Sequence, residues 1–485
     1  MVTTALIIAA GAGARLHKLT GSVPKPLLPL TGVPLLKRII LTANKAGIAR
    51  FVIVTGHAAD QLHEVLGSDP QLQDLIDWVH NDAWHQPNGV SVLAARERID
   101  EPFALLMADH LFEEQTLERL LQVPLKSDEC ILAIDTNVVS VYDLDDATKV
   151  YAEEGRILEI NKKLDRYNAV DTGMFVCTPS LFEALETARR DDGCSLSDGI
   201  QALARNGKMR VHDIGDGFWQ DIDTPEMLDH AEDMLLRRLR KPTDGVVSRY
   251  LNRHISTRIS KNLVRTPLTP NHVTLITFAT GLLSAWFVAA GDYWSVFWGA
   301  MLFQLSSILD GCDGEVAKLT FSESKYGSWL DTITDNLTYV AFFGGIVWAY
   351  AEMETSSAAL TLGTASVIAV TLSILLMYYY LANTGKSGSL VRYNEAFREH
   401  AAKPQPSQLA RMLNIFRLMA KRDFFTMLLL VFAVMDHLDW MFWTVSVGGF
   451  VMAVAVFLST GRLLSQDRAA QQTEIVADET AGGGA

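Results

Sequence analysis

The chain has 485 residues, enough for two or three domains, and a formal net charge of −14. The charge is uneven, because residues 1–230 hold 21 Lys and Arg against 35 Asp and Glu, whereas the remainder holds 21 of each. An acidic first half argues against a nucleic-acid-binding protein. The cysteines lack paired spacing, so we expect reduced, buried thiols instead of disulfides or a zinc site at Cys130, Cys177, Cys194 and Cys312.

The first half alternates short apolar runs with helix-like stretches. The opening MVTTALIIAAGAG has no basic flank and only a short apolar run, so it predicts a buried strand and a cytoplasmic first half, not a signal peptide. The alternation predicts a Rossmann-like α/β fold with a mostly parallel sheet and helices on both faces. Strands are predicted at Leu6–Ala10, Phe51–Thr55, Phe103–Met107, Cys130–Ile134 and Met174–Cys177, and helices at Leu35–Ala46 and Leu181–Ala188.

The character of the sequence changes after this first domain, which we place at 1–232. Residues 237–265 are rich in Arg and Lys, and apolar residues such as Tyr250 and Ile255 recur among them at helical spacing. This pattern predicts a basic linker and a juxtamembrane amphipathic helix over 233–268, lying on a membrane surface. The alternative is an ordinary solvated helix.

Long apolar stretches dominate the second half. Each is near the length that crosses a bilayer, although the fifth is short. They predict an all-α, six-helix transmembrane domain over 269–465, followed by a small polar tail at 466–485 that we expect to be disordered. The stretches lie at about 272–290, 293–309, 336–352, 358–382, 424–436 and 441–460.

The loops between these stretches predict the orientation. Those near 291, at 351–357 and at 436–440 contain no Lys or Arg, whereas the opposite loops hold Lys318, Lys325 and further basic residues up to Arg422. By the positive-inside rule, both termini and the basic loops lie on the cytoplasmic side of the inner membrane.

A glycine-rich loop follows the first predicted strand. Its sequence, AAGAGAR, ends at Arg15, and Pro24-Lys25-Pro26-Leu27 follows ten residues later. Glycines there let backbone N–H groups approach phosphate, and Arg15 adds positive charge. The third glycine of a dinucleotide-binding loop and the Gly-Lys-Ser/Thr of a Walker A loop are both missing.

These two pieces resemble the signature of the sugar-nucleotide pyrophosphorylase (nucleotidyltransferase) family over about residues 3–232. The resemblance implies that Ala10, Gly11, Gly13 and Arg15 wrap the triphosphate and that Lys25 stabilises charge on the α-phosphate. It also implies Mg²⁺ held by two aspartates. These are Asp109, at the end of an apolar strand, and Asp221 in Trp-Gln-Asp-Ile-Asp, with Asp223 as second choice.

The acceptor pocket of this domain is marked by two further stretches. Glu159–Lys163 resembles the family segment whose lysine meets the acceptor phosphate, and we favour Lys162. Asp171-Thr172-Gly173 resembles the acceptor-binding loop, and the alternative is that Asp171 and Thr172 are turn residues.

Residues 310–335 carry four carboxylates at the edge of the predicted membrane domain. Asp310 and Asp313 are three apart on one helix, and Asp331 and Asp335 are four apart on the next, so each pair shares a helix face. Such carboxylates would repel one another unless cations joined them, and oxygen ligands suit Mg²⁺ or Mn²⁺. The spacing therefore predicts a site for two divalent ions.

The same segment reads Asp-x-x-Asp-Gly-x-x-Ala-Lys, then after eight residues Gly-x-x-x-Asp-x-x-x-Asp, and it resembles the CDP-alcohol phosphotransferase signature. Lys318 stands where the family has arginine, which keeps the charge but loses the planar fork. The resemblance covers about 245–465 and implies metal binding by all four aspartates, with Asp335 also acting as base. It implies nucleotide contacts from Gly314, Ala317, Lys318 and Gly327. Pro270–Thr274 resembles the start of the family's first membrane helix, where we favour a structural role.

One half would make a CDP-activated alcohol from CTP, and the other would consume it. This arrangement resembles the bifunctional inositol-1-phosphate cytidylyltransferase and CDP-inositol:inositol-1-phosphate transferase enzymes. That implies inositol-1-phosphate as substrate, a CDP-alcohol intermediate and a lipid bilayer, and relatives in the transferase family often form homodimers. Three alternatives stay open: another alcohol phosphate, transfer to a lipid hydroxyl, or a non-catalytic first half.

A second substrate that carries a phosphate needs cationic partners. The candidates on the predicted cytoplasmic side are Arg249, Arg253, Arg258 and Arg392. For each of them the alternative is contact with a lipid headgroup.

Overall fold

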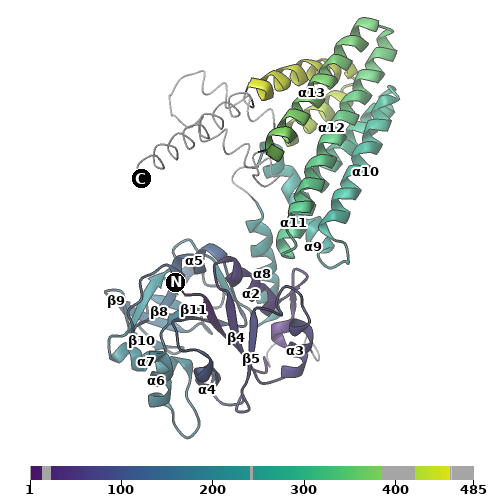
Figure 1. Ribbon diagram of the computed structural model, residues 1–485. Coiled ribbons are helices and arrows are strands. Elements are labelled where there is room, and N and C mark those ends of the chain that lie inside the picture. Colours follow the sequence, from purple (N-terminus) through teal and green to yellow (C-terminus); the bar gives the residue numbers. More distant parts are fainter. Residues whose placement is uncertain (1, 14–22, 241–243, 384–420, 459, 461–485) are drawn as a thin grey trace, which may run out of the picture. The chain divides into compact units, whose positions relative to one another are not determined.

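A computed structural model of the chain describes residues 2–13, 23–240, 244–383, 421–458 and 460 (Figure 1). It divides the chain into two compact units, Met1–Arg237 and Arg238–Ala485, the first α/β and the second helical. The α/β and helical classes predicted for the two halves are confirmed. Arg15, Arg392 and the predicted tail at 466–485 lie outside the described residues.

The first unit is built on a sheet of nine strands in the order β5-β4-β1-β6-β11-β8-β12-β10-β9. Its central strands are apolar and buried on both faces, which is why short continuous apolar runs predicted them. The strands are β1 (Thr4–Ala9), β4 (Arg50–Thr55), β5 (Ile76–His80), β6 (Phe103–Met107), β8 (Cys130–Asp135), β9 (Lys149–Glu153), β10 (Arg156–Asn161), β11 (Ala169–Cys177) and β12 (Met209–Asp213).

The sheet is mixed in direction. Strands β5, β4, β1 and β6 are parallel, as are β8 and β12, whereas β11 runs antiparallel to both β6 and β8. The parallel part brings the carboxyl ends of β1 and β6 to one edge, where ligands bind in open α/β sheets. Two short ribbons lie apart from the main sheet, β2 (Pro29–Leu30) with β3 (Val33–Pro34), and β7 (His110–Phe112) with β13 (Trp219–Asp221).

Helices flank this sheet and complete its core. Phe103 on β6 stacks on Phe182 at a ring separation of 5.3 Å, and both are almost fully buried. The predicted helices are confirmed within one residue at each end. The helices are α2 (Leu35–Lys45), α3 (Ala59–Gly67), α4 (Asn88–Ala94), α5 (Glu114–Leu121), α6 (Ser180–Ala188), α7 (Leu196–Arg205) and α8 (Pro225–Arg238). All four cysteines are free and buried, as predicted.

Long helices make up the second unit, and each predicted apolar stretch lies on one of them. In the described part of the chain, three helices are long and apolar enough to cross a membrane, at Pro270–Ala289, Ser357–Tyr380 and Leu438–Leu458. The helices are α10 (Pro270–Ala289), α11 (Tyr293–Leu319), α12 (Lys325–Glu354), α13 (Ser357–Asn383), α16 (Arg422–Val434) and the segment Leu438–Leu458. Helices α11 and α12 continue beyond their apolar stretches and carry the aspartates.

Close approach of small residues packs these helices together. A Cβ at Gly281 on α10 would collide with Thr338 on α12, and one at Gly345 would collide with the Ala285 carbonyl. Phe303 on α11 stacks on Phe342 at 3.9 Å between ring centroids. Small residues at helix contacts are typical of helical membrane proteins.

The basic stretch after the first unit forms a π-helical turn (Ser248–Asn252) and α9 (Arg253–Leu263). Its buried face is polar, because Ser256 and Ser260 hydrogen-bond to Glu315 on α11. Of the apolar side chains predicted to face a membrane, Tyr250, Leu251 and Ile255 are exposed, whereas Val247, Ile259 and Leu263 are half-buried. The contact of this segment with a membrane stays a prediction.

Candidate active sites

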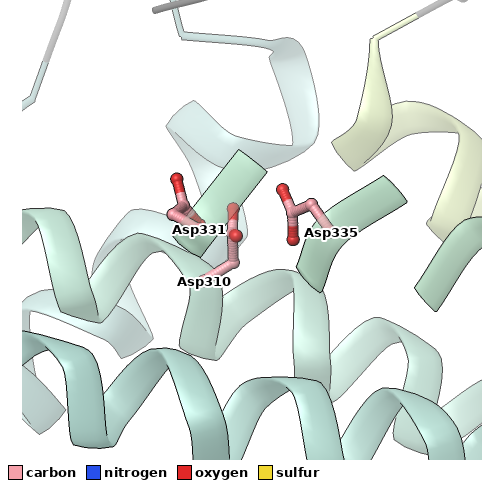
Figure 2. A group of neighbouring side chains, drawn as sticks. All are labelled: Asp310, Asp331 and Asp335. Carbon is pink, nitrogen blue, oxygen red and sulfur yellow. The ribbon is translucent and has the colours of Figure 1, made fainter. Parts of the chain in front are cut away.

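Three of the four predicted aspartates of the second unit meet at one point. Asp310 lies on α11, and Asp331 and Asp335 lie one turn apart on α12; each offers a carboxylate oxygen within 4.8 Å of the other two (Figure 2). The spacing of four residues places the α12 pair on one helix face. Local helix geometry therefore builds this part of the site.

Asp313, the fourth predicted aspartate, makes hydrogen bonds of its own. Its Oδ2 accepts from the Thr274 hydroxyl at 2.6 Å, and its Oδ1 accepts from the backbone N–H of Gly314 at 2.5 Å. Thr274 lies on α10, so this contact fixes the carboxylate with respect to a third helix. Among the described residues Asp313 does not join the three converging carboxylates.

An arginine that the sequence analysis did not assign to the site lies among the carboxylates. Nη1 of Arg422, at the start of α16, donates to Asp310 Oδ1 at 2.7 Å and to Asp335 Oδ2 at 2.5 Å. The side chain is only 19% exposed. The sequence signal that could have pointed to Arg422 is its position. It directly precedes an apolar stretch and lies at the same predicted membrane end as the aspartates.

A cavity of about 220 Å³ is lined by Asp331, one of the converging carboxylates, and by Asp313. The residues predicted to contact nucleotide line it, together with Asn271 and Thr274 from α10. The start of α10 therefore has two roles, because Thr269 and His272 also form a capping box that begins the helix. The predicted nucleotide contacts brought to this cavity are Gly314, Ala317, Lys318 and Gly327.

Arg253, predicted to bind an acceptor phosphate, is engaged by carboxylates of the second unit. It donates from Nη1 to Glu315 Oε1 at 2.6 Å and from Nε to Asp244 Oδ2 at 3.0 Å. These two carboxylates occupy the guanidinium that was predicted to bind a phosphate. Arg249 and Arg258 are exposed on the same segment.

In the first unit, Lys25 bridges two of the predicted metal ligands. Its Nζ lies 2.5 Å from Asp109 Oδ2 and 2.6 Å from Asp223 Oδ1, and its side chain is 8% exposed. Gly13 packs against Lys25 with φ of +59°, where a Cβ would lie 2.8 Å from that of the lysine. The glycine loop and the lysine, twelve residues apart, thus form one site. Ala10 and Gly11 precede Gly13 in the same loop.

Opposite charges govern ionisation in this site. Burial alone would lower the pKa of Lys25, but the charges of Asp109 and Asp223 outweigh it and raise that pKa. Burial also opposes ionisation of Asp109, yet Lys25 and a hydrogen bond from His110 lower the pKa of this carboxyl. The lysine is therefore a cation and Asp109 an anion at neutral pH.

Asp221, the first choice as second ligand, has a different neighbourhood. Burial raises its pKa, and its Oδ1 accepts a hydrogen bond from Gln220 at 3.1 Å. His110 Nδ1 lies 2.8 Å from Asp109 Oδ1, and its ring stacks on Trp219. The structure thus places Asp223, and not Asp221, with Asp109 on the lysine.

The three residues of the first unit that were predicted to bind the acceptor have different surroundings in the structure. Thr172 is fully buried and donates to the Ala133 carbonyl at 2.8 Å, so the structure supports its alternative role as a structural residue. Lys162 is 55% exposed and pairs with Asp146 at 3.0 Å. Asp171 accepts from the backbone N–H of Gly173 at 2.7 Å, as an aspartate in a turn does.

Asp171→Asn is expected to stabilise the first unit at pH 7. Burial raises the pKa of Asp171 to about 6, so the folded protein binds this proton more tightly than the unfolded chain does. The free energy of unfolding of the wild type therefore falls as the pH rises from about pH 4 to pH 6. The asparagine variant has no carboxyl at this position, so its free energy of unfolding does not fall for this reason. The free energy of unfolding of the variant should exceed that of the wild type by at most about 3 kcal/mol, and this difference should stay constant above pH 6. Calorimetry of the two solubilised proteins across this range measures it.

Asp165→Asn is the matched control, because Asp165 is an exposed aspartate of the same unit. It should leave the melting temperature nearly unchanged at every pH. A gain from Asp171→Asn that is the same at pH 4 and pH 7 would contradict the titration argument and point to a packing effect.

Both sites offer donor sets that fit a divalent cation. Three carboxylates converge in the second unit and two in the first, in each case around one basic group. Carboxylate oxygens are the ligands that hard divalent ions prefer. In the described part of the second unit, the converging set is Asp310, Asp331 and Asp335.

Comparison with known proteins places the two units in known families. Residues 5–205 match the MobA-like NTP transferase domain, and residues 267–460 match CDP-alcohol phosphatidyltransferase. The inositol-1-phosphate CTP transferase structure from T. maritima is 28% identical over 48% of this chain and 94% of that one, with a TM-score of 0.45.

Two curated relatives align with both units. The bifunctional IPC transferase and DIPP synthase of Aquifex aeolicus is 37% identical over 71% of this chain and 77% of that protein. The protein of the same name from Thermococcus kodakarensis is 31% identical over 91% of this chain and 94% of that protein. The chain therefore belongs to the family of bifunctional IPC transferases and DIPP synthases.

Proposed function

We propose that the chain makes CDP-inositol from CTP and inositol-1-phosphate, and then transfers the phosphoinositol group to a second inositol-1-phosphate. The observation that carries this proposal is the pair of sites in one polypeptide. In one site a lysine contacts two aspartates beside a glycine loop, and in the other Asp331 belongs both to the converging aspartates and to the lining of a cavity. The product of the first site is the donor for the second.

In the first reaction, a phosphate oxygen of inositol-1-phosphate attacks the α-phosphorus of CTP, and pyrophosphate leaves. Lys25 would neutralise charge that develops on the α-phosphate, and Gly11, Gly13 and Arg15 would bind the β- and γ-phosphates. We propose Asp109 with Asp223 as the carboxylates that hold a divalent ion, because Lys25 already brings them together.

In the second reaction, a hydroxyl of the acceptor attacks the β-phosphorus of CDP-inositol, and CMP leaves. Asp335 accepts the hydroxyl proton, while Gly314, Ala317, Lys318 and Gly327 bind the CDP moiety in the cavity. Asp310, Asp313 and Asp331 complete the carboxylate set. When bound in either site, Mg²⁺ supplies positive charge to the phosphates in the transition state.

We further propose six membrane spans with both termini and both sites on the cytoplasmic side of the inner membrane. Three apolar helices support spanning directly, and the basic loops at one end support the orientation. Arg249 and Arg258 remain candidate contacts for the acceptor phosphate, because both are exposed on the predicted cytoplasmic side.

The test supplies the full chain, in lipid nanodiscs with Mg²⁺, with CTP and a panel of alcohol phosphates. We expect pyrophosphate release to be fastest with inositol-1-phosphate and CMP to follow once CDP-inositol accumulates. A product that stays in water supports the phosphorylated acceptor, whereas extraction into organic solvent would favour a lipid acceptor. CMP release from supplied CDP-inositol without any pyrophosphate release would overturn the first reaction alone.

A further inference from the structure

The guanidinium group of Arg422 lies against the carboxylate cluster in the second unit. It contacts two of the three aspartates that converge there, Asp310 at 2.7 Å and Asp335 at 2.5 Å. Figure 2 shows the three carboxylates, two from α12 and one from α11, and α16 begins beside them. A single monovalent cation therefore joins carboxylates from two different helices.

The remaining contacts of Arg422 hold it weakly. Its Nε is buried and finds no hydrogen-bond acceptor in the part of the chain that the structure describes. Its guanidinium carbon lies 5.4 Å from the centre of the Tyr339 ring, a distance typical of a cation–π contact. A buried guanidinium with an unpaired N–H is incompletely satisfied, so its position depends on the two carboxylates.

The backbone at this point is fixed independently. The next residue, Asp423, is buried and accepts from the backbone N–H of Ser248 at 2.7 Å. A Cβ on Gly245 would collide with the same carboxylate. The start of α16 is therefore anchored by contacts that do not involve the Arg422 side chain.

We propose that Arg422 is a built-in counter-ion that competes with divalent metal for Asp310 and Asp335, and that metal binding displaces its guanidinium. This inference rests on the proposed function, which assigns these carboxylates to metal. A bridging arginine stabilises the metal-free cluster, because carboxylates this close repel one another without a cation. The same contact opposes metal entry, because both cations need the same two carboxylates. Arg422 is thus a positioning residue that sets metal affinity.

The test measures Mn²⁺ binding by the full chain in nanodiscs, in an Asp109→Asn background that weakens the metal site of the first unit. We expect Arg422→Gln to bind Mn²⁺ about tenfold more tightly than its parent, because a competitor worth about 1.4 kcal/mol is removed. Arg265→Gln, the same charge change at an exposed arginine, is the matched control and should leave the affinity unchanged.

Thermal unfolding gives a second readout that does not depend on catalysis. With EDTA, Arg422→Gln should melt below its parent, and saturating Mn²⁺ should abolish the difference. If the Arg422→Gln protein does not accumulate, Arg422→Lys replaces it in the Mn²⁺ binding test. One ammonium bridges two carboxylates less well than a guanidinium does, so this variant should show a gain in Mn²⁺ affinity between those of the parent and Arg422→Gln.

Equal or weaker Mn²⁺ binding by the Arg422 variants would overturn the proposal and show that the arginine only organises the site. Absence of Mn²⁺ binding by the parent and by every variant is a different result. It would remove the metal assignment of the aspartates and, with it, the proposed second reaction.

Discussion

Asp335→Asn is expected to lower CMP release from CDP-inositol by about 10³-fold, while pyrophosphate release from CTP stays within twofold of wild type. Asparagine keeps the shape of the side chain but cannot accept the proton of the attacking hydroxyl. It also removes one of the three converging carboxylates and one of the two partners of Arg422. The two rates are measured on the same preparation, so the first reaction reports that the chain is folded.

Asp292→Asn provides the matched control for this variant. Asp292 caps the N-terminus of α11, the same helix that carries Asp310 at its other end, and its carboxylate accepts from the backbone N–H of Ser295. Asparagine caps helices nearly as well, so both reactions should be retained. A loss of less than tenfold in Asp335→Asn would rule this residue out as the base.

Lys25→Met is expected to produce the opposite pattern. Pyrophosphate release should fall by about 10²- to 10³-fold, because the group that neutralises the α-phosphate is lost. CMP release from supplied CDP-inositol should continue at the wild-type rate. Methionine fills the space of the lysine stem but leaves Asp109 and Asp223 without their shared cation.

Lys37→Met is the control for the loss of a partly buried lysine. Lys37 forms an ion pair with Asp69 in the same unit, and its side chain is 16% exposed. That variant should keep both reactions. If Lys25→Met slows pyrophosphate release no more than Lys37→Met does, the lysine has only a structural role and the first site must be reassigned.

Much of the fold was predictable because its signals are local. The apolar run Phe103–Met107 matches β6 residue for residue, and α2 ends one residue before the prediction. The strands β9 and β10 were not predicted, because they carry charged and exposed residues along much of their length. The antiparallel direction of β11 was not predictable either, since it depends on pairing with strands far away in sequence.

The same contrast holds for the sites. The spacing of four residues was enough to predict that Asp331 and Asp335 share a face of one helix. That Asp310 converges with them, whereas Asp313 is not among the three, depends on the packing of α11 against α12. Arg422 lies 87 residues beyond Asp335. Its place before an apolar stretch puts it at the same predicted membrane end, but does not by itself show that it contacts the aspartates. Likewise, Arg253 fits a basic surface pattern, and only the fold reveals Glu315 as its partner.

The stretch just after the first unit is tied to α11 and α16 of the second. Arg253 joins Asp244 to Glu315 on α11, and Asp423 on α16 holds Ser248. Gene fission or domain exchange within this family is therefore constrained. A break placed ahead of Asp244 leaves these ties intact, and a foreign nucleotidyltransferase could be joined there. A break only ten residues later would fall after Arg253 and would leave the buried Glu315 on α11 without its arginine partner. The second unit, produced without that arginine, would lose the ion pair that joins this stretch to α11.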